Sequence, residues 1–262
     1  MGRSLFDLIL TLLSAVLLFF ILAPLLKLLV GSDINLILTT IQEQEVYQSL
    51  LTTFKASLVA TLITLCLGIP LAYLLARGTF FGKSIIEGII NLPVIIPHTA
   101  AGIALLTVFG SRFFGGRLFG YLGLEFMGHF AGIVIGMMFV SLPFLVNEAK
   151  EGFRAIDVRL EKVSRTLGAT PAQTFFKVAL PLNLNHIISG AVMMWGRGLS
   201  EFGAVVILAY HPMTAPILVY ERFTSYGLKY SKPIAIIMIM VTLVIFIGLR
   251  LLYSKEGRGE ND

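Results

Sequence analysis

The 262-residue chain has little of several things: one cysteine, one tryptophan and few charged residues. Its single cysteine, Cys66, lies in an apolar run, which excludes a disulfide framework and a thiolate metal site. Asp, Glu, Lys and Arg make up 13% of the residues, against about 25% in soluble domains. Hydrophobic residues make up 56%, and the mean hydropathy is +0.88. The composition therefore excludes an ordinary soluble domain and indicates a multi-pass membrane protein.

The apolar runs predict an all-α fold with six transmembrane helices in a single domain, residues 1–262. The first run is longer than a signal-peptide core and has no clear cleavage site of small residues, so we expect it to be retained. We expect loops at 31–48, 110–128 and 210–232, and a longer cytoplasmic loop at about 150–181. The predicted spans are 5–30, 54–76, 85–109, 130–146, 187–209 and 233–253.

The basic residues predict the orientation of these spans. Twelve of the 20 Lys and Arg residues fall on one side, seven on the other, and Arg197 falls in the membrane. Because cytoplasmic loops carry the excess of Lys and Arg, both termini and the loop at 150–181 should be cytoplasmic. The same loops explain the net charge of +5, so we expect a cell-membrane location, contact with lipid and no nucleic-acid partner.

The stretch from Arg159 to Pro181 is a charged segment between two apolar runs. Leu160, Val163 and Leu167 recur at i, i+3 and i+7, which predicts one apolar face on a short surface helix. Glu161 stands four residues before Arg165, the favourable order for an i,i+4 ion pair. By spacing alone, this helix is either a docking element for a partner or an interfacial helix on an anionic membrane surface.

Local signals divide this segment into two helices. Gly168 is placed to end the first helix in a left-handed conformation. Thr170, Pro171 and Gln173 supply an N-cap, a proline at the first helical position and a capping-box partner. The sequence therefore predicts a helix, a glycine break and a capped helix.

The span 85–109 is predicted to be broken. Pro93 and Pro97, four residues apart, free backbone carbonyls at membrane depth, which is tolerated only where protein or a water-filled cavity meets them. We expect this helix, with Thr99, to line a pathway. For His98 alone we expect a histidine whose hydrogen bonds a neighbour satisfies.

A second polar site is predicted in the span 187–209. Arg197 and Glu201 form an i,i+4 pair inside an apolar helix, which is costly unless the two charges are paired or face water. With Ser200 they belong either to a pathway or to a structural pair between helices. A doubly charged anion would meet hydroxyls, N–H groups and Arg197, and Glu201 would repel it unless neutralised.

No catalytic constellation is visible. Gly82-Lys83-Ser84 superficially resembles a P-loop, but Arg77 stands where the first glycine belongs and a membrane helix replaces the buried strand. The four histidines are scattered, with no His-Glu-x-x-His and no Gly-x-Ser-x-Gly, which disfavours an intramembrane enzyme. We expect no catalytic residue, metal site or bound cofactor, so that ATP and Mg²⁺ would belong to a partner. A secondary transporter is disfavoured because only the span 85–109 is strongly broken.

Three stretches resemble the permeases of ABC importers. Gly168 is followed by nine residues and then by Val178-Ala179-Leu180-Pro181, as in their Glu-Ala-Ala, three residues, Gly, nine residues, Ile-x-Leu-Pro loop. Lys162-Val163-Ser164 departs from Glu-Ala-Ala. The stretches 92–106 and 200–223 are similar to molybdate and tungstate permeases of the archaeal type, with sulfate and thiosulfate permeases as near neighbours. The resemblance covers about residues 50–232.

This resemblance implies a homodimer with its pathway on the two-fold axis, two cytoplasmic ATPase subunits and an extracytoplasmic oxyanion-binding protein. The imported substrate would be tungstate or molybdate, or alternatively sulfate or thiosulfate. Leu160, Val163, Leu167 and Gly168 would seat in an ATPase cleft, and Glu161 and Arg165 would pair with its rim. The coupling residues are Arg159, Leu160, Glu161, Val163, Arg165, Leu167, Gly168 and Ala169. The pathway or gate residues are Pro93, Pro97, Thr99, Arg197, Ser200 and Glu201.

Overall fold

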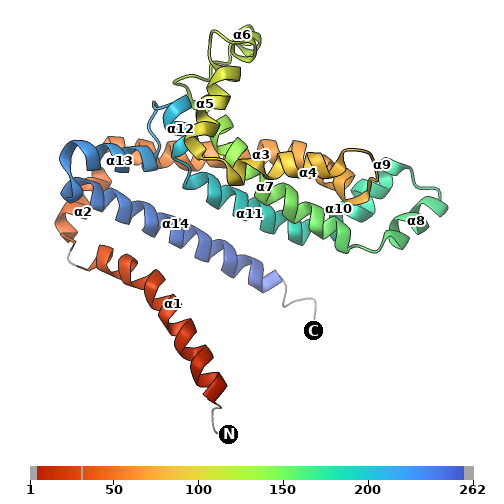
Figure 1. Ribbon diagram of the computed structural model, residues 1–262, viewed down its shortest axis with the longest axis horizontal. Coiled ribbons are helices and arrows are strands. Elements are labelled where there is room, and N and C mark those ends of the chain that lie inside the picture. Colours follow the sequence, from red (N-terminus) through yellow and green to blue (C-terminus); the bar gives the residue numbers. More distant parts are fainter. Residues whose placement is uncertain (1–4, 31, 257–262) are drawn as a thin grey trace. The chain divides into compact units, whose positions relative to one another are not determined.

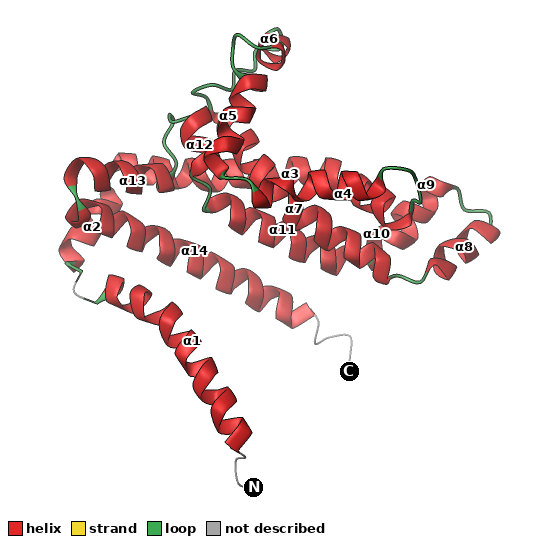
Figure 2. Ribbon diagram, viewed as in Figure 1, coloured by secondary structure: helices red, strands yellow, loops and turns green. Residues whose placement is uncertain are grey.

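The computed structural model describes residues 5–30 and 32–256, and within this part helices are joined by loops and there is no strand (Figure 2). The expected all-α fold is confirmed. The predicted cytoplasmic ends fall largely on residues outside the described ranges and stay a prediction. The chain forms two compact units, Met1–Gln48 with Leu218–Asp262, and Ser49–Ile217.

The first unit contains helices that the sequence did not predict. α2 occupies most of the expected loop 31–48, and it begins because the Asp33 carboxylate accepts the N–H groups of Asn35 and Leu36. α13 likewise replaces much of the expected loop 210–232. Arg222 of α13 pairs with Glu43 at 2.8 Å and Glu45 at 2.6 Å. The helices with residues in this unit are α1 (Leu5–Leu29), α2 (Ile34–Gln42), α3 (Gln44–Arg77), α13 (Ala215–Tyr226) and α14 (Leu228–Glu256).

The second unit is a bundle in which α7 packs extensively along α11 and also contacts α4, α5 and α12 (Figure 1). Its buried core includes Ile133, Met137 and Leu145 of α7, together with Met194 of α11 and Val205 of α12. Besides parts of α3 and α13, the helices are α4 (Lys83–Ile95), α5 (His98–Phe109), α6 (Phe114–Gly120), α7 (Phe130–Ala155), α8 (Val158–Thr166), α9 (Pro171–Thr174), a π-helix (Phe175–Ala179), α10 (Leu180–Leu182), α11 (Leu184–Leu199) and α12 (Gly203–Leu208).

Four of the described helices, α1, α3, α7 and α14, are long and apolar enough to cross a membrane. Two bent helix pairs raise the number to six if each pair is one span, which matches the predicted number, although the second pair covers 171–199 and not the predicted 187–209. The first pair joins α4 and α5 at 116°, and the second joins the helices of Pro171–Leu182 to α11 at 69°. The predicted boundaries need correction, because α3 and α7 extend well beyond 54–76 and 130–146.

Candidate functional site

The α4–α5 bend lies where the sequence predicts a broken helix, and Pro97 is the proline that marks it. α4 ends at Ile95, Ile96 is extended, and Pro97 is the N-cap of α5. A residue before proline is driven out of the helical region, and this explains the extended Ile96. Pro93 lies buried inside α4, one turn before the break. Of the two predicted pathway prolines, only Pro97 is therefore at the break.

A second break divides the predicted span 187–209, and the expectation of one continuous helix there is wrong. α11 ends at Leu199, with Ser200 as its C-cap, and α12 begins at Gly203. Glu201 accepts a hydrogen bond from the Ala204 N–H at 2.9 Å, so its carboxylate satisfies one of the free donors at the start of α12. The second half of the chain thus also has a broken helix.

The segments beyond the two breaks, α5 and α12, pack closely against each other (Figure 1). A Cβ added at Gly102 of α5 would lie 2.8 Å from the Ala204 carbonyl oxygen and 2.9 Å from the Ile207 Cβ. A Cβ added at Gly203 would lie 2.7 Å from the His98 Cβ. Glycine at these two positions therefore allows α5 and α12 to cross closely. The crossing places the α4–α5 break next to the α11–α12 break.

We expect Gly102→Ala to destabilise the protein by about 1–3 kcal/mol, the cost of an overpacked core, because its Cβ would meet the backbone of α12. Gly88→Ala in α4 is the matched control, since a Cβ there has nothing within 4 Å. That change should stabilise the helix by about 0.5–1 kcal/mol. Thermal unfolding in detergent measures both, and equal shifts of the same sign would contradict the close crossing.

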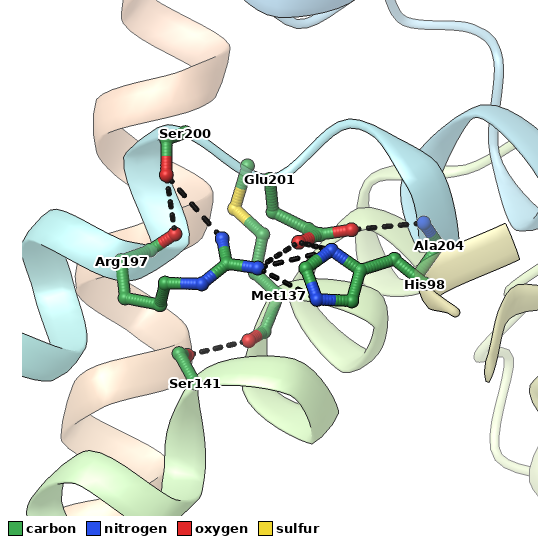
Figure 3. A network of polar contacts seen from close by, with 7 residues as sticks. All are labelled: His98, Met137, Ser141, Arg197, Ser200, Glu201 and Ala204. Carbon is green, nitrogen blue, oxygen red and sulfur yellow. Dashed lines mark hydrogen bonds and ion pairs between the residues drawn. The ribbon is translucent and has the colours of Figure 1, made fainter. Parts of the chain in front are cut away.

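A polar cluster joins the two breaks (Figure 3). Glu201 Oε2 lies 3.0 Å from Arg197 Nη2 and 3.1 Å from His98 Nδ1. The Glu201 side chain is 1% exposed, so it needs these partners to remain charged. The predicted Arg197–Glu201 pair is confirmed. His98 is the third member, and its place beside a proline-broken helix is the signal that could have assigned it to the site.

The outer side of this cluster carries the hydrogen-bond donors. Arg197 Nη1 donates to Ser200 Oγ at 3.3 Å, and Nη2 lies 3.0 Å from both ring nitrogens of His98 (Figure 3). Ser200 and Thr99 are exposed, whereas Glu201 is buried. The cluster therefore presents a guanidinium and hydroxyls with the carboxylate masked, a surface that does not repel an anion. Within residues 5–30 and 32–256, no group of His, Cys, Asp and Glu side chains is placed to hold a metal ion.

The segment predicted to be cytoplasmic is the second candidate site, and its first helix, α8, has the ends that the sequence predicts. The Asp157 carboxylate accepts the Arg159 N–H at 2.9 Å at the start of α8. At its end Gly168 has φ +92°. The Gly168 N–H bonds the Arg165 carbonyl at 3.0 Å, and the Ala169 N–H bonds the Ser164 carbonyl at 3.1 Å. This is a Schellman motif, so the predicted left-handed glycine is confirmed.

The helix that follows is also capped as predicted. Gln173 N–H donates to Thr170 Oγ1 at 3.2 Å, and Thr170 N–H donates to Gln173 Oε1 at 2.9 Å, with Pro171 at the first helical position. The chain then forms the π-helix before Pro181. Proline cannot donate a backbone hydrogen bond, and a widened turn before it is one way in which a helix accommodates that loss.

α8 has two different faces. Leu160, Val163 and Leu167 are exposed, Leu167 to 83%. Glu161 is buried on the other side, where Arg77 and Tyr73 bind its carboxylate. The expected i,i+4 pair of Glu161 with Arg165 is therefore wrong, because Arg77, which lies 84 residues earlier in the chain, holds this carboxylate. Arg165 is exposed, as Arg159 and Gly168 are, and Ala169 is half-buried.

Comparison with known proteins identifies the class. The family model of the binding-protein-dependent transport system inner membrane component matches residues 65–255. The molybdate/tungstate transport system permease protein WtpB of Methanocaldococcus jannaschii is 42% identical over 254 residues, 97% of this chain and 99% of that protein. The corresponding protein of Pyrococcus abyssi is 42% identical over 85% of each chain. The sulfate transport system permease protein CysT of Synechocystis is 30% identical over 80% of this chain and 75% of its own length.

Solved structures show the same fold at lower identity. A bacterial ABC transporter that imports alginate superposes with a TM-score of 0.74, at 18% identity and 95% coverage of both chains. The MetNI methionine ABC transporter superposes with a TM-score of 0.62, at 17% identity, over 80% of this chain and 95% of that one. The fold is that of an ABC-importer permease. The chain belongs to the family of binding-protein-dependent transport system inner membrane components, and it is a membrane protein.

Proposed function

We propose that the chain is the membrane-spanning subunit of an ATP-driven importer of molybdate or tungstate. The observation that carries this proposal is the 42% identity to the Methanocaldococcus jannaschii molybdate/tungstate permease over almost the whole of both chains. The polar cluster supports it, because the buried Glu201 is neutralised and Arg197 with Ser200 can contact an anion. Held by one arginine and hydroxyls, an oxyanion would bind weakly enough to leave again.

ATP hydrolysis belongs to a partner in this proposal. α8 presents an apolar face of Leu160, Val163 and Leu167. The Asp157 carboxylate caps its start and backbone hydrogen bonds close its end, so it offers a preformed helix to a groove. A cytoplasmic ABC ATPase subunit is the expected owner of that groove. Two such subunits would serve a homodimer of this chain.

The pathway is proposed to run between two copies of the chain, past the joined breaks of the α4–α5 and α11–α12 segments. Pro97, Thr99, Arg197, Ser200 and Glu201 lie at or beside these breaks and would form the gate. An extracytoplasmic binding protein would deliver the oxyanion and determine most of the selectivity, because one arginine and neighbouring hydroxyls would hold an oxyanion only weakly. Hydrolysis would reset the gate.

Reconstitution tests this function directly. The chain, its ATPase and its binding protein are assembled in proteoliposomes, and uptake of tungstate, molybdate and sulfate is measured with and without ATP. ATP-dependent uptake of tungstate or molybdate with little sulfate is expected. Preferential sulfate uptake would favour the alternative that the 30% identity to a sulfate permease represents, and uptake without ATP would contradict an importer driven by ATP.

The orientation gives a separate prediction. Lys162 is exposed on α8, and Lys162→Cys should react with a membrane-impermeant maleimide only when the cytoplasmic side is accessible. Because Cys66 is exposed in the isolated chain, the label is applied in a Cys66→Ser background. Labelling of intact cells at position 162 would invert the proposed topology.

A further inference from the structure

The inward face of α8 carries an ion pair that the proposed docking role does not require. Arg77 at the end of α3 donates from Nε to Glu161 Oε1 at 2.8 Å, and its Nη2 lies 2.7 Å from the same oxygen. Tyr73, one turn earlier in α3, donates its hydroxyl to Glu161 Oε2 at 2.7 Å. Both carboxylate oxygens of Glu161 are therefore held by α3.

This contact is largely screened from solvent. The side chains of Arg77 and Glu161 are 16% and 11% exposed. Arg77 Nη2 also donates to the Ile156 carbonyl at 3.1 Å, in the turn that leads into α8. A guanidinium fork with several fixed acceptors holds its geometry better than an exposed pair between flexible side chains. Arg77 therefore fixes both α8 and its entry turn.

The Tyr73 ring extends the contact into the helices on either side of α8. It packs at 5.2 Å from the Phe153 ring near the end of α7 and at 4.9 Å from the Phe175 ring in the π-helix. The segments before and after α8 thus contact the same residue of α3. α8 and the segments on either side of it are therefore packed against the end of α3.

α3 leads from this contact to the intramembrane cluster. Ser57 donates its hydroxyl to the Trp195 carbonyl at 2.7 Å, two residues before Arg197. Ser57 and Arg77 are separated by about 30 Å of helix. In the bundle formed by residues 49–217, α8 lies at one end, and α5 and α12 lie at the other (Figure 1). One helix therefore contacts both α8 and the part of α11 beside the cluster.

We propose that Arg77, Glu161 and Tyr73 form a clamp, a set of positioning residues that passes a displacement of α8 to α3 and so to the helix breaks around Arg197. This inference rests on the proposed function, because it assigns the route by which an ATPase subunit seated on Leu160 and Leu167 moves the pathway. Coupling between two distant sites requires a structural element whose arrangement each site can shift. In this proposal Glu161 binds Arg77 and Tyr73 of its own chain and not the rim of the ATPase cleft.

The test uses the reconstituted complex with tungstate, and compares Glu161→Gln with Glu151→Gln. Glu151 is the matched control, because it pairs with Arg154 at 2.9 Å but is 56% exposed. Glu161→Gln should retain the co-purifying ATPase and its hydrolysis, while tungstate uptake per ATP falls about tenfold, within the range of measured couplings between sites. Glu151→Gln should keep the wild-type ratio. Glu161→Asp and the exchange Arg77→Glu with Glu161→Arg should each recover part of the loss.

Two results would overturn the clamp. One is an unchanged uptake-to-hydrolysis ratio in Glu161→Gln, and the other is loss of the ATPase from that variant, which would place Glu161 at the docking interface. Hydrogen exchange of the full chain alone in lipid nanodiscs needs no transport. Amides 160–167 should exchange faster in Glu161→Gln than in Glu151→Gln, and equal rates would refute the clamp. A wild-type complex without ATP-dependent uptake would count against the proposed function only.

Discussion

Gly168→Pro is expected to reduce ATP-driven uptake by about tenfold or more, a change within the usual range of coupling between two sites, while membrane insertion stays normal. Gly168 has φ +92° and donates its N–H to the Arg165 carbonyl. Proline holds φ near about −65° and has no N–H, so the Schellman end of α8 cannot form. Leu167 and Ala169 would then leave their positions. Uptake into proteoliposomes, with the amount of inserted protein measured in parallel, tests this expectation.

Gly168→Asn is the matched control for the backbone argument. A Cβ at residue 168 has nothing within 4 Å, so any loss must come from the left-handed conformation and not from a clash. Asparagine enters that conformation more readily than other residues with side chains. It should retain most of the uptake, and a proline variant as active as the asparagine variant would remove Gly168 from the coupling mechanism.

Arg197→Leu is expected to destabilise the protein by about 3–5 kcal/mol, because it leaves a buried carboxylate without its cationic partner. Glu201 is almost fully buried, and its other ligands are His98 and the Ala204 N–H. Thermal or denaturant unfolding in detergent, followed by helix content, measures the loss. Uptake should fall as well, since the α11–α12 break loses its ion pair and His98 of α5 loses its contact with Arg197.

The double variant Arg197→Leu with Glu201→Gln separates pairing from packing. Glutamine is neutral, and its oxygen can still accept from the Ala204 N–H, so the start of α12 stays capped. The double variant should therefore be considerably more stable than Arg197→Leu alone. A double variant as unstable as the single one would mean that Arg197 stabilises the fold by packing and not by charge.

Features encoded within a few residues could be predicted from the sequence. Gly168 ended α8, and Thr170 with Gln173 capped α9, because caps and left-handed turns depend on neighbours along the chain. The Arg197–Glu201 pair followed from i,i+4 spacing in an apolar stretch. Pro97 marked the first break because proline restricts the residue before it.

Features that depend on distant residues could not be predicted. No proline marks the break at Ser200–Phe202, which forms where the Glu201 carboxylate caps α12 and contacts His98 from another helix. The i,i+4 spacing alone pairs Glu161 with Arg165, but Arg77 binds it across 84 residues of sequence. α2 has nine residues, too few to span a membrane, so hydropathy does not predict it, and its local signal is the N-cap residue Asp33.

The capping of both α8 and α9 has a consequence for the rate at which a partner would bind. Hydrogen bonds within residues 157–173 already fix the shape of α8 and α9. Because the segment is ordered before a partner binds, binding costs it little conformational entropy. Association would then proceed by rigid docking, with a rate limited by orientation and not by folding of the loop.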